Sequence, residues 1–142
     1  MQLDTNQVKQ ILPHREPMLM IDTAHDLIPG ESVTAEKHFD EKWEVYCGHF
    51  PSSPVTPGIF LVEAMAQAAD IVLLSLPENA GKLPLFLGIS RVRFLRPVPP
   101  GSDVTITAVL SQTADGGVYE CTSSVFVEGR KAASGLVTLA LR

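Results

Sequence analysis

The residues best suited to chemistry lie in one stretch, Cys47 to Asp70, which reads CGHFPSSPVTPGIFLVEAMAQAAD. Its first half holds a single histidine, His49, followed by three prolines that restrict the backbone. Its second half carries Glu63, Gln67 and Asp70 at spacings of four and three, which places them on one stripe of a helix. A fixed imidazole and a carboxyl are groups that general acid–base catalysis uses.

The helix predicted from Gly58 to Leu76 is apolar on almost every face, which is typical of a helix in the middle of a domain. Apolar neighbours surround Glu63, so we expect burial to raise the pKa of its carboxyl and to make it a proton donor. Gln67, one turn later, is expected to orient Glu63 by a hydrogen bond. Asp70 is expected to reach the rim of the domain, and the alternative is that it is a third member of the catalytic group.

The start of this helix offers a further group. The first backbone N–H groups of a helix have no partner within the helix and carry the positive end of its dipole. At Gly58 such an N–H could polarise a carbonyl and hold an enolate-like oxygen, and the absence of a side chain would let a substrate approach closely.

The remaining candidates are weaker. His14 is expected to pack and to form hydrogen bonds within its loop, and His25 and His38 are expected at the surface. The four histidines lack a metal-binding spacing such as HExxH. Cys47 has no evident activating base and is expected to be a buried thiol.

A cluster of three arginines stands out in a chain whose net charge is -5. Two readings stay open: an ordinary solvated strand face, or a docking patch for an acidic partner. The residues are Arg91, Arg93 and Arg96.

The length and composition of the chain limit the kinds of protein that it can be. A chain of 142 residues with 45% hydrophobic and 19% charged residues predicts one folded domain. The net negative charge gives no reason to expect nucleic acid. Two cysteines without a CxxC motif favour reduced thiols. The polar N-terminus does not look like a signal peptide, and the apolar run is short for a membrane span and contains acids. We therefore expect a cytoplasmic protein.

The elements around the central helix are mostly strands. A short first helix should begin at Asp4 or Thr5 and end at Pro13. Glycine-containing turns at residues 114–117 and 128–130 indicate hairpins and an antiparallel meander. This sheet should curl around the helix, and its uncovered edge favours a dimer that continues the sheet. The expected strands are residues 18–21, 32–39, 85–96, 104–110, 118–127 and 131–141.

These features together resemble a known family. The similarity is to the β-hydroxyacyl-acyl carrier protein dehydratases of bacterial type II fatty acid synthesis, and it rests on GHFPSSPVTPGIFLVEAMAQ with LPHREPMLMID before it and GISRVRFLRPVPPGSD after it. The resemblance implies an α+β hot-dog fold, with a long sheet wrapped around one helix, as a single domain over residues 1–142. Glutamate at position 63 favours this branch over the related dehydratase/isomerase, which usually has aspartate there. Ser52-Ser53 departs from the glycine that the family often has after GHFP.

The resemblance also implies roles. His49 and Glu63 would be the catalytic pair, contributed by different protomers of a homodimer, and the dimers could assemble as a trimer of dimers. Neither a cofactor nor a metal is implied. Acyl carrier protein would be the partner that docks on the arginine cluster. The residues expected to bind the acyl thioester substrate are Gly58, Gln67, Phe50 and Pro57.

The predicted reaction is dehydration of a (3R)-3-hydroxyacyl thioester to the trans-2-enoyl thioester. In one hypothesis His49 removes the proton on C2 and protonated Glu63 donates to the departing hydroxyl. Two other divisions of the proton transfers stay open: the opposite sharing, or His49 performing both while Glu63 only positions water. Two alternatives remain open at this point: a hot-dog thioesterase, and a non-catalytic acyl-binding subunit. The acyl chain length and the choice between a carrier protein and coenzyme A are also open.

Overall fold

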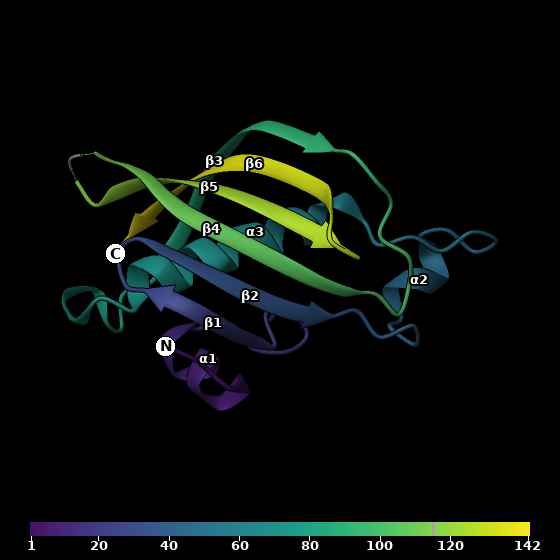
Figure 1. The fold of residues 1–142 in the computed structure, drawn as a ribbon, viewed down its shortest axis with the longest axis horizontal. Coiled ribbons are helices and arrows are strands. Elements are labelled where there is room, and N and C mark those ends of the chain that lie inside the picture. The colour runs from purple at the N-terminus through teal and green to yellow at the C-terminus, as the bar shows by residue number, and fades with distance from the viewer. Residues whose placement is uncertain (115) are drawn as a thin grey trace.

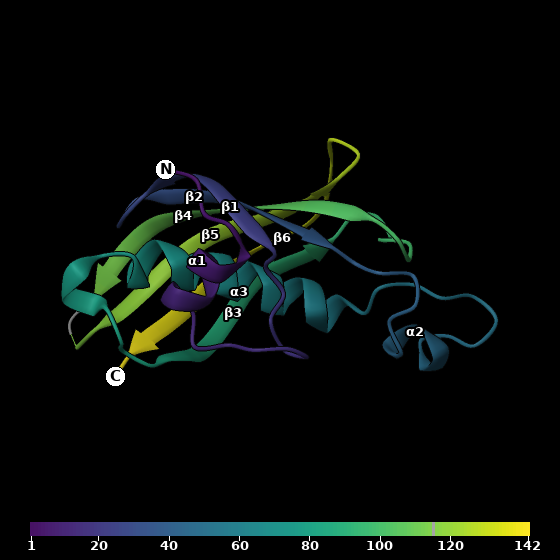
Figure 2. The ribbon, with the colours of Figure 1, turned by 90° about the horizontal axis from the view of Figure 1, so that it is seen from below.

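The computed structural model describes residues 1–114 and 116–142, which form one antiparallel sheet around a central helix (Figures 1 and 2). The long helix α3 (Gly58–Leu74) lies along the concave face of the sheet, and the short helix α1 (Thr5–Ile11) packs against α3 and against the edge strand β1 (Thr23–Ile28). The α+β hot-dog architecture expected from the sequence is confirmed. The elements are α1 (Thr5–Ile11), β1 (Thr23–Ile28), β2 (Ser32–His38), α2 (Val45–Gly48), α3 (Gly58–Leu74), the 3-10 turn η1 (Pro77–Asn79), β3 (Pro84–Phe94), β4 (Asp103–Ala114), β5 (Val118–Val127) and β6 (Arg130–Leu141).

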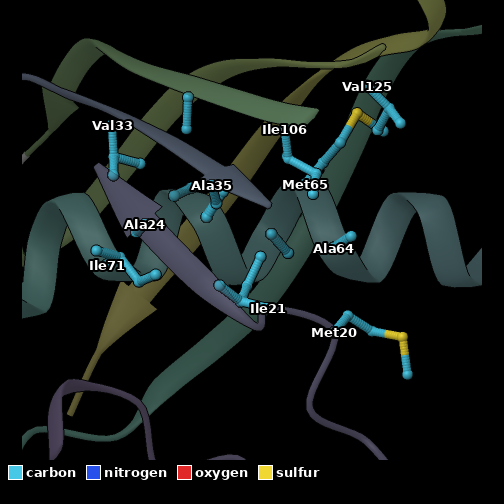
Figure 3. Packing of buried hydrophobic residues seen from close by; sticks show 14 of the residues in the cluster. Met20, Ile21, Ala24, Val33, Ala35, Ala64, Met65, Ile71, Ile106 and Val125 are labelled. Atoms are coloured by element: carbon cyan, nitrogen blue, oxygen red, sulfur yellow. The ribbon is translucent and has the colours of Figure 1, made fainter. Parts of the chain in front are cut away.

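Helix α3 is buried on every side through most of its length, from Ala64 to Leu74. The sheet covers it with the inward-facing side chains of alternating strands, because successive residues of a strand point to opposite faces. On β4 these are Val104, Ile106 and Ala108, all fully buried. Figure 3 shows Met65 of α3 lying between Ile106 and Val125. No helix in the described ranges combines the length and hydropathy needed to cross a membrane.

The strand order, β1-β2-β4-β5-β6-β3, differs in part from the expected meander. Strands β4, β5 and β6 are consecutive neighbours, as predicted. Strand β3 instead pairs with β6 at the far edge, because α3 carries the chain across the face of the sheet before β3 begins. The predicted turn at residues 128–130 is present; the one at 114–117 includes Asp115, which lies outside the described residues.

The predicted strand at residues 18–21 is wrong. This segment joins no ladder, although Leu19, Met20 and Ile21 are buried. Its backbone is paired by a side chain instead: Met20 N–H donates to Gln67 Oε1 at 2.7 Å, and Gln67 Nε2 donates to the Met18 carbonyl at 2.8 Å. The first strand of the sheet, β1, begins at Thr23, two residues after the predicted segment ends, and was not predicted.

We predict that Gln67→Leu destabilises the fold. The substitution leaves the buried Met20 N–H and the partly buried Met18 carbonyl unpaired, and a buried group without a partner costs about 1–3 kcal/mol. We expect the free energy of unfolding, measured by urea denaturation, to fall by about 2–4 kcal/mol.

The matched control is Ser75→Ala, which removes one hydrogen bond to the Val72 carbonyl near the end of α3. Its loss should be about 1 kcal/mol or less. Equal stability of Gln67→Leu and the wild type would contradict the role assigned to this amide.

Candidate active site

His49 lies at the end of α2, and one of its ring nitrogens is occupied. Nδ1 is 3.0 Å from the carbonyl oxygen of Val55. Because a carbonyl can only accept, Nδ1 must carry the hydrogen, and Nε2 of the neutral ring then presents its lone pair. The imidazole also stacks on the Phe50 ring, with the ring centroids 4.1 Å apart. The side chain is thus fixed in the tautomer that a base acting through Nε2 needs.

Local hydrogen bonds hold the loop that presents His49. The Val55 N–H donates to the His49 carbonyl at 2.9 Å, so the two residues are joined by both backbone and ring. Between them Phe50 and Ser53 exchange two backbone hydrogen bonds, which shows that serine here is compatible with a closed turn. The buried Thr56 anchors the loop through its contact of 2.6 Å with the Tyr46 hydroxyl.

Glu63 lies on the second turn of α3, and its side chain is 22% exposed. Its Oε2 accepts a hydrogen bond of 2.7 Å from Gln67 Nε2, as the spacing of four predicted. Gln67 is itself fully buried and bonded to the 18–20 segment, so its position is set by the core. His14 Nε2 lies 3.7 Å from the same oxygen. Oε2 of Glu63 is therefore fixed by Gln67 and lies near His14, while Oε1 has no partner in the described residues.

Asp70 does not reach the rim, contrary to expectation. The residue is 3% exposed, because α3 is covered all round at this depth. Burial, assisted by the negative charge of Glu63, raises the pKa of the Asp70 carboxyl well above its usual range. His14 was also read too simply from the sequence: it is not only a loop residue, since it stands beside both acids. The spacing of the stripe hinted at Asp70, but nothing in the sequence placed His14 opposite it.

The first turn of α3 borders a pocket of about 410 Å³. Gly58 opens the helix after Pro57, and its N–H has no partner within the helix. The Phe94 ring lies directly against this glycine: a Cβ built there would be 2.8 Å from Phe94 Cζ. Only glycine leaves room for both the ring and a ligand at this amide. The pocket is lined by Val55, Thr56, Gly58, Leu61, Phe94, Leu95, Arg96, Pro97 and Val98.

His49 and Glu63 are not joined within one chain. Among residues 1–114 and 116–142, no hydrogen bond or ion pair links the two side chains. The loop that carries His49 extends beyond the sheet at the N-terminal end of α3 (Figures 1 and 2). Phe50 in this loop is 53% exposed. The groups predicted to react thus stand at an open end of the molecule.

The other candidates occupy the surface. Arg91 and Arg93 of β3 and Arg96 just after it are exposed, and none has an ion-pair partner within the described ranges. Cys47 is exposed, so the prediction of a buried thiol at this position is wrong; Cys121, for which no such prediction was made, is buried. No group of three His, Cys, Asp or Glu residues is placed to hold a metal ion in the described part of the chain.

Comparisons with solved structures show what fold this geometry belongs to. The structure is similar to the dehydratase heterocomplex ApeI:P from Xenorhabdus doucetiae, with a TM-score of 0.77 and 20% identity over 95% of this chain and 90% of that one. It is also similar to a hypothetical thioesterase protein with coenzyme A from Streptococcus pneumoniae, with a TM-score of 0.65 and 13% identity over 84% of each chain. At these identities the likeness concerns the fold alone.

Sequence comparison identifies the family. The FabA-like domain model matches residues 12–135. Two relatives are both named 3-hydroxyacyl-[acyl-carrier-protein] dehydratase FabZ. The one from Oenococcus oeni is 39% identical over 93% of this chain and 94% of its own length. The one from Natranaerobius thermophilus is 39% identical over 97% and 96%. The chain belongs to the family of FabA-like 3-hydroxyacyl-[acyl-carrier-protein] dehydratases.

Proposed function

We propose that the protein dehydrates (3R)-3-hydroxyacyl thioesters on acyl carrier protein to trans-2-enoyl thioesters in fatty acid elongation, with His49 and Glu63 as the catalytic pair. The observation that carries the assignment of the pair is the hydrogen bond from His49 Nδ1 to the Val55 carbonyl, which leaves Nε2 as a base. Family membership supplies the class of reaction. The reaction is a hydro-lyase elimination.

In the proposed mechanism Nε2 of His49 takes the proton from C2 of the substrate. The electron pair of the C2–H bond forms the C2=C3 double bond as the C3–O bond breaks. The proton on C2 is acidified when its carbanion is delocalised onto the thioester oxygen, which the Gly58 N–H stabilises at the start of α3. The His49 ring then carries the positive charge, and its Nδ1–H remains bonded to Val55.

Glu63 completes the elimination by giving a proton to the departing hydroxyl, which leaves as water. Its Oε2 is fixed by Gln67, so Oε1 is the oxygen available to the substrate. In the reverse direction, Glu63 would activate the water that adds to C3 and His49 would protonate C2. The catalytic pair is regenerated when His49 has lost the proton that it took and Glu63 has gained one.

We also propose where the substrate and its carrier lie. The pocket beside Gly58 is bordered by Leu61, Phe94 and Val98, which suit the first part of an apolar acyl chain. Phe50 and Pro57, which belong to the His49 loop, lie beside the path by which the substrate would reach this pocket. Arg96 lines this pocket, and with Arg91 and Arg93 it forms an exposed basic strip for the acidic carrier protein.

The active unit in this proposal is a homodimer joined through β3. This strand is an edge of the sheet, and the consecutive residues Leu85 and Phe86, which point to opposite faces, are each 40% exposed. An edge strand that is apolar on both faces is a site for pairing with another copy. Pairing there would bring the His49 loop of one protomer to the Glu63 of the other.

We predict that His49→Ala and Glu63→Gln each lower kcat by about 10²–10⁴, the usual contribution of a general acid or base. The assay follows enoyl thioester formation on acyl carrier protein, with thiol release recorded in parallel to detect a thioesterase. His25→Ala, at a surface histidine paired with Asp26 and Glu36, should keep full activity. Near-normal turnover in either site variant would sink the assignment.

We predict that Gly58→Ala folds but loses roughly 10²-fold in kcat/KM. The added methyl group would displace the Phe94 ring, which is 55% exposed and can swing away at small cost, and would occupy the space above the amide. Circular dichroism and dehydration kinetics test this together. Wild-type kinetics in a folded Gly58→Ala protein would show that the amide does not bind the reacting carbonyl.

We predict that Leu87→Lys converts the dimer to a monomer and abolishes turnover, because a charge on the edge strand opposes pairing. Val109→Lys is the matched control: Val109 is 50% exposed on the interior strand β4. This control should keep both the dimer and the activity. The measurement is mass by light scattering beside the dehydration rate; an active monomer of Leu87→Lys is the contrary result.

A further inference from the structure

Tyr46 of α2 contacts both ends of the loop that carries His49. Its backbone carbonyl accepts a hydrogen bond of 3.3 Å from the His49 N–H. Its side-chain hydroxyl lies 2.6 Å from Thr56 Oγ1 near the other end of the loop, and either hydroxyl can donate this hydrogen bond. Tyr46 and Thr56 are 3% and 4% exposed, so the contact is shielded from water. A short, buried hydrogen bond therefore closes the loop.

Thr56 is also bonded to the wall of the pocket at the start of α3. Its N–H donates to the Val98 carbonyl at 2.9 Å, and both residues line that pocket. The residue before it, Val55, accepts the Nδ1–H of His49 at 3.0 Å. The Tyr46 hydroxyl is thus one residue away from the carbonyl that orients the base, and it is bonded to the wall that the substrate would pass.

The Tyr46 side chain is itself fixed by aromatic packing. Its ring lies edge-on against Trp43, with the centroids 5.5 Å apart and the planes at 88°. Trp43 in turn packs edge-on against Phe60, in the first turn of α3, at 4.7 Å. Burial raises the pKa of the Tyr46 phenol, an effect that its hydrogen bond with Thr56 opposes. The hydroxyl is therefore neutral and is held at a set position relative to the start of α3, where Gly58 lies.

We propose that Tyr46 is a positioning residue, whose hydrogen bond with Thr56 sets the position of the His49 base relative to the Gly58 N–H. These two groups belong to the same protomer, so their relative position depends on the loop between them and not on pairing with a second copy. The inference rests on the proposed roles of His49 and Gly58.

The length of the contact is the property that apolar packing does not reproduce. Apolar carbon atoms approach each other to about 3.5–4.0 Å, whereas the two oxygens are 2.6 Å apart. Replacing both hydroxyls by apolar groups would therefore move Thr56 away from Tyr46 by about 1 Å. Because Val55 precedes Thr56, the His49 ring would move with its carbonyl partner. A displacement of about 1 Å from a reacting geometry can cost about 10²-fold in rate.

The test compares variants that nearly preserve the shapes of the side chains. Tyr46→Phe and Thr56→Val each leave the other hydroxyl buried without a partner, so each should lower Tm by a few degrees. The double variant removes both hydroxyls and should regain most of that Tm, because no buried hydroxyl is left unpaired. In all of these proteins we expect kcat for enoyl thioester formation to fall by about 10- to 100-fold, with KM changed far less.

The double variant separates positioning from stability. A merely structural role predicts that kcat recovers together with Tm, and that result would overturn the proposal. Wild-type kcat in a folded Tyr46→Phe protein would overturn it as well. Thr56→Ser keeps the hydroxyl and should keep most of the wild-type kcat; a loss as large as that of Thr56→Val would show that the hydroxyl is not the group that matters.

The Nδ1–H of His49 provides a measurement that does not depend on activity. Its hydrogen bond to Val55 should slow its exchange with water in the wild type, and its nuclear magnetic resonance signal is identified by its absence in His49→Ala. We expect faster exchange in Tyr46→Phe and in the double variant with Thr56→Val, because the carbonyl is held less firmly. Exchange as slow as in the wild type in both proteins would contradict the proposal.

Ser123→Ala is the control for loss of a buried hydroxyl elsewhere. Ser123 is 1% exposed on β5 and donates a hydrogen bond of 2.7 Å to the Thr107 carbonyl. This variant should lower Tm and leave kcat and the exchange of the His49 proton unchanged. An equal fall in kcat in this control would count against a specific role of Tyr46. Full activity in His49→Ala would instead overturn the assignment of the base, so the two failures are distinct.

Discussion

The side chain of Gln67 is the interaction on which the rest of the site depends. It is fully buried, and it joins the central helix to the 18–20 segment through two backbone hydrogen bonds. Its second N–H contact fixes Oε2 of Glu63 at 2.7 Å. One amide therefore pairs a segment that has no strand neighbour and aims the acid that the proposed mechanism uses. The same side chain thus serves the stability of the fold and the position of Glu63. A substitution at Gln67 would therefore affect both.

The sheet covers only part of α3, which explains why a single chain leaves its candidate catalytic groups exposed. Six strands cover the middle and the C-terminal part of α3. The N-terminal turn of the helix and the His49 loop extend past the sheet (Figure 2). The same geometry leaves β3 as an edge with apolar side chains on both faces. A second copy at that edge would complete the sheet and, in our proposal, would also complete the active site.

The sequence was most informative where a single local rule decided the structure. An almost wholly apolar run predicted α3, the spacing of four predicted the Gln67–Glu63 hydrogen bond, and glycine at a tight turn predicted the β5–β6 hairpin. Failures occurred where tertiary contacts decided. Residues 18–21 are apolar like a strand, yet a side chain from α3 satisfies their backbone. The placement of β3 beside β6, and of His14 between two acids separated by seven residues, depends on how the chain crosses the sheet.

The most direct test of the central claim is complementation between inactive subunits. His49→Ala and Glu63→Gln proteins are unfolded together, refolded as a mixture and assayed for enoyl thioester formation. If each site takes its histidine from one protomer and its glutamate from the other, half of the mixed protein is heterodimer and each heterodimer has one intact site. The account predicts recovery of about a quarter of wild-type activity. A mixture that stays as inactive as its two components, despite heterodimer formation shown by mass, would contradict it.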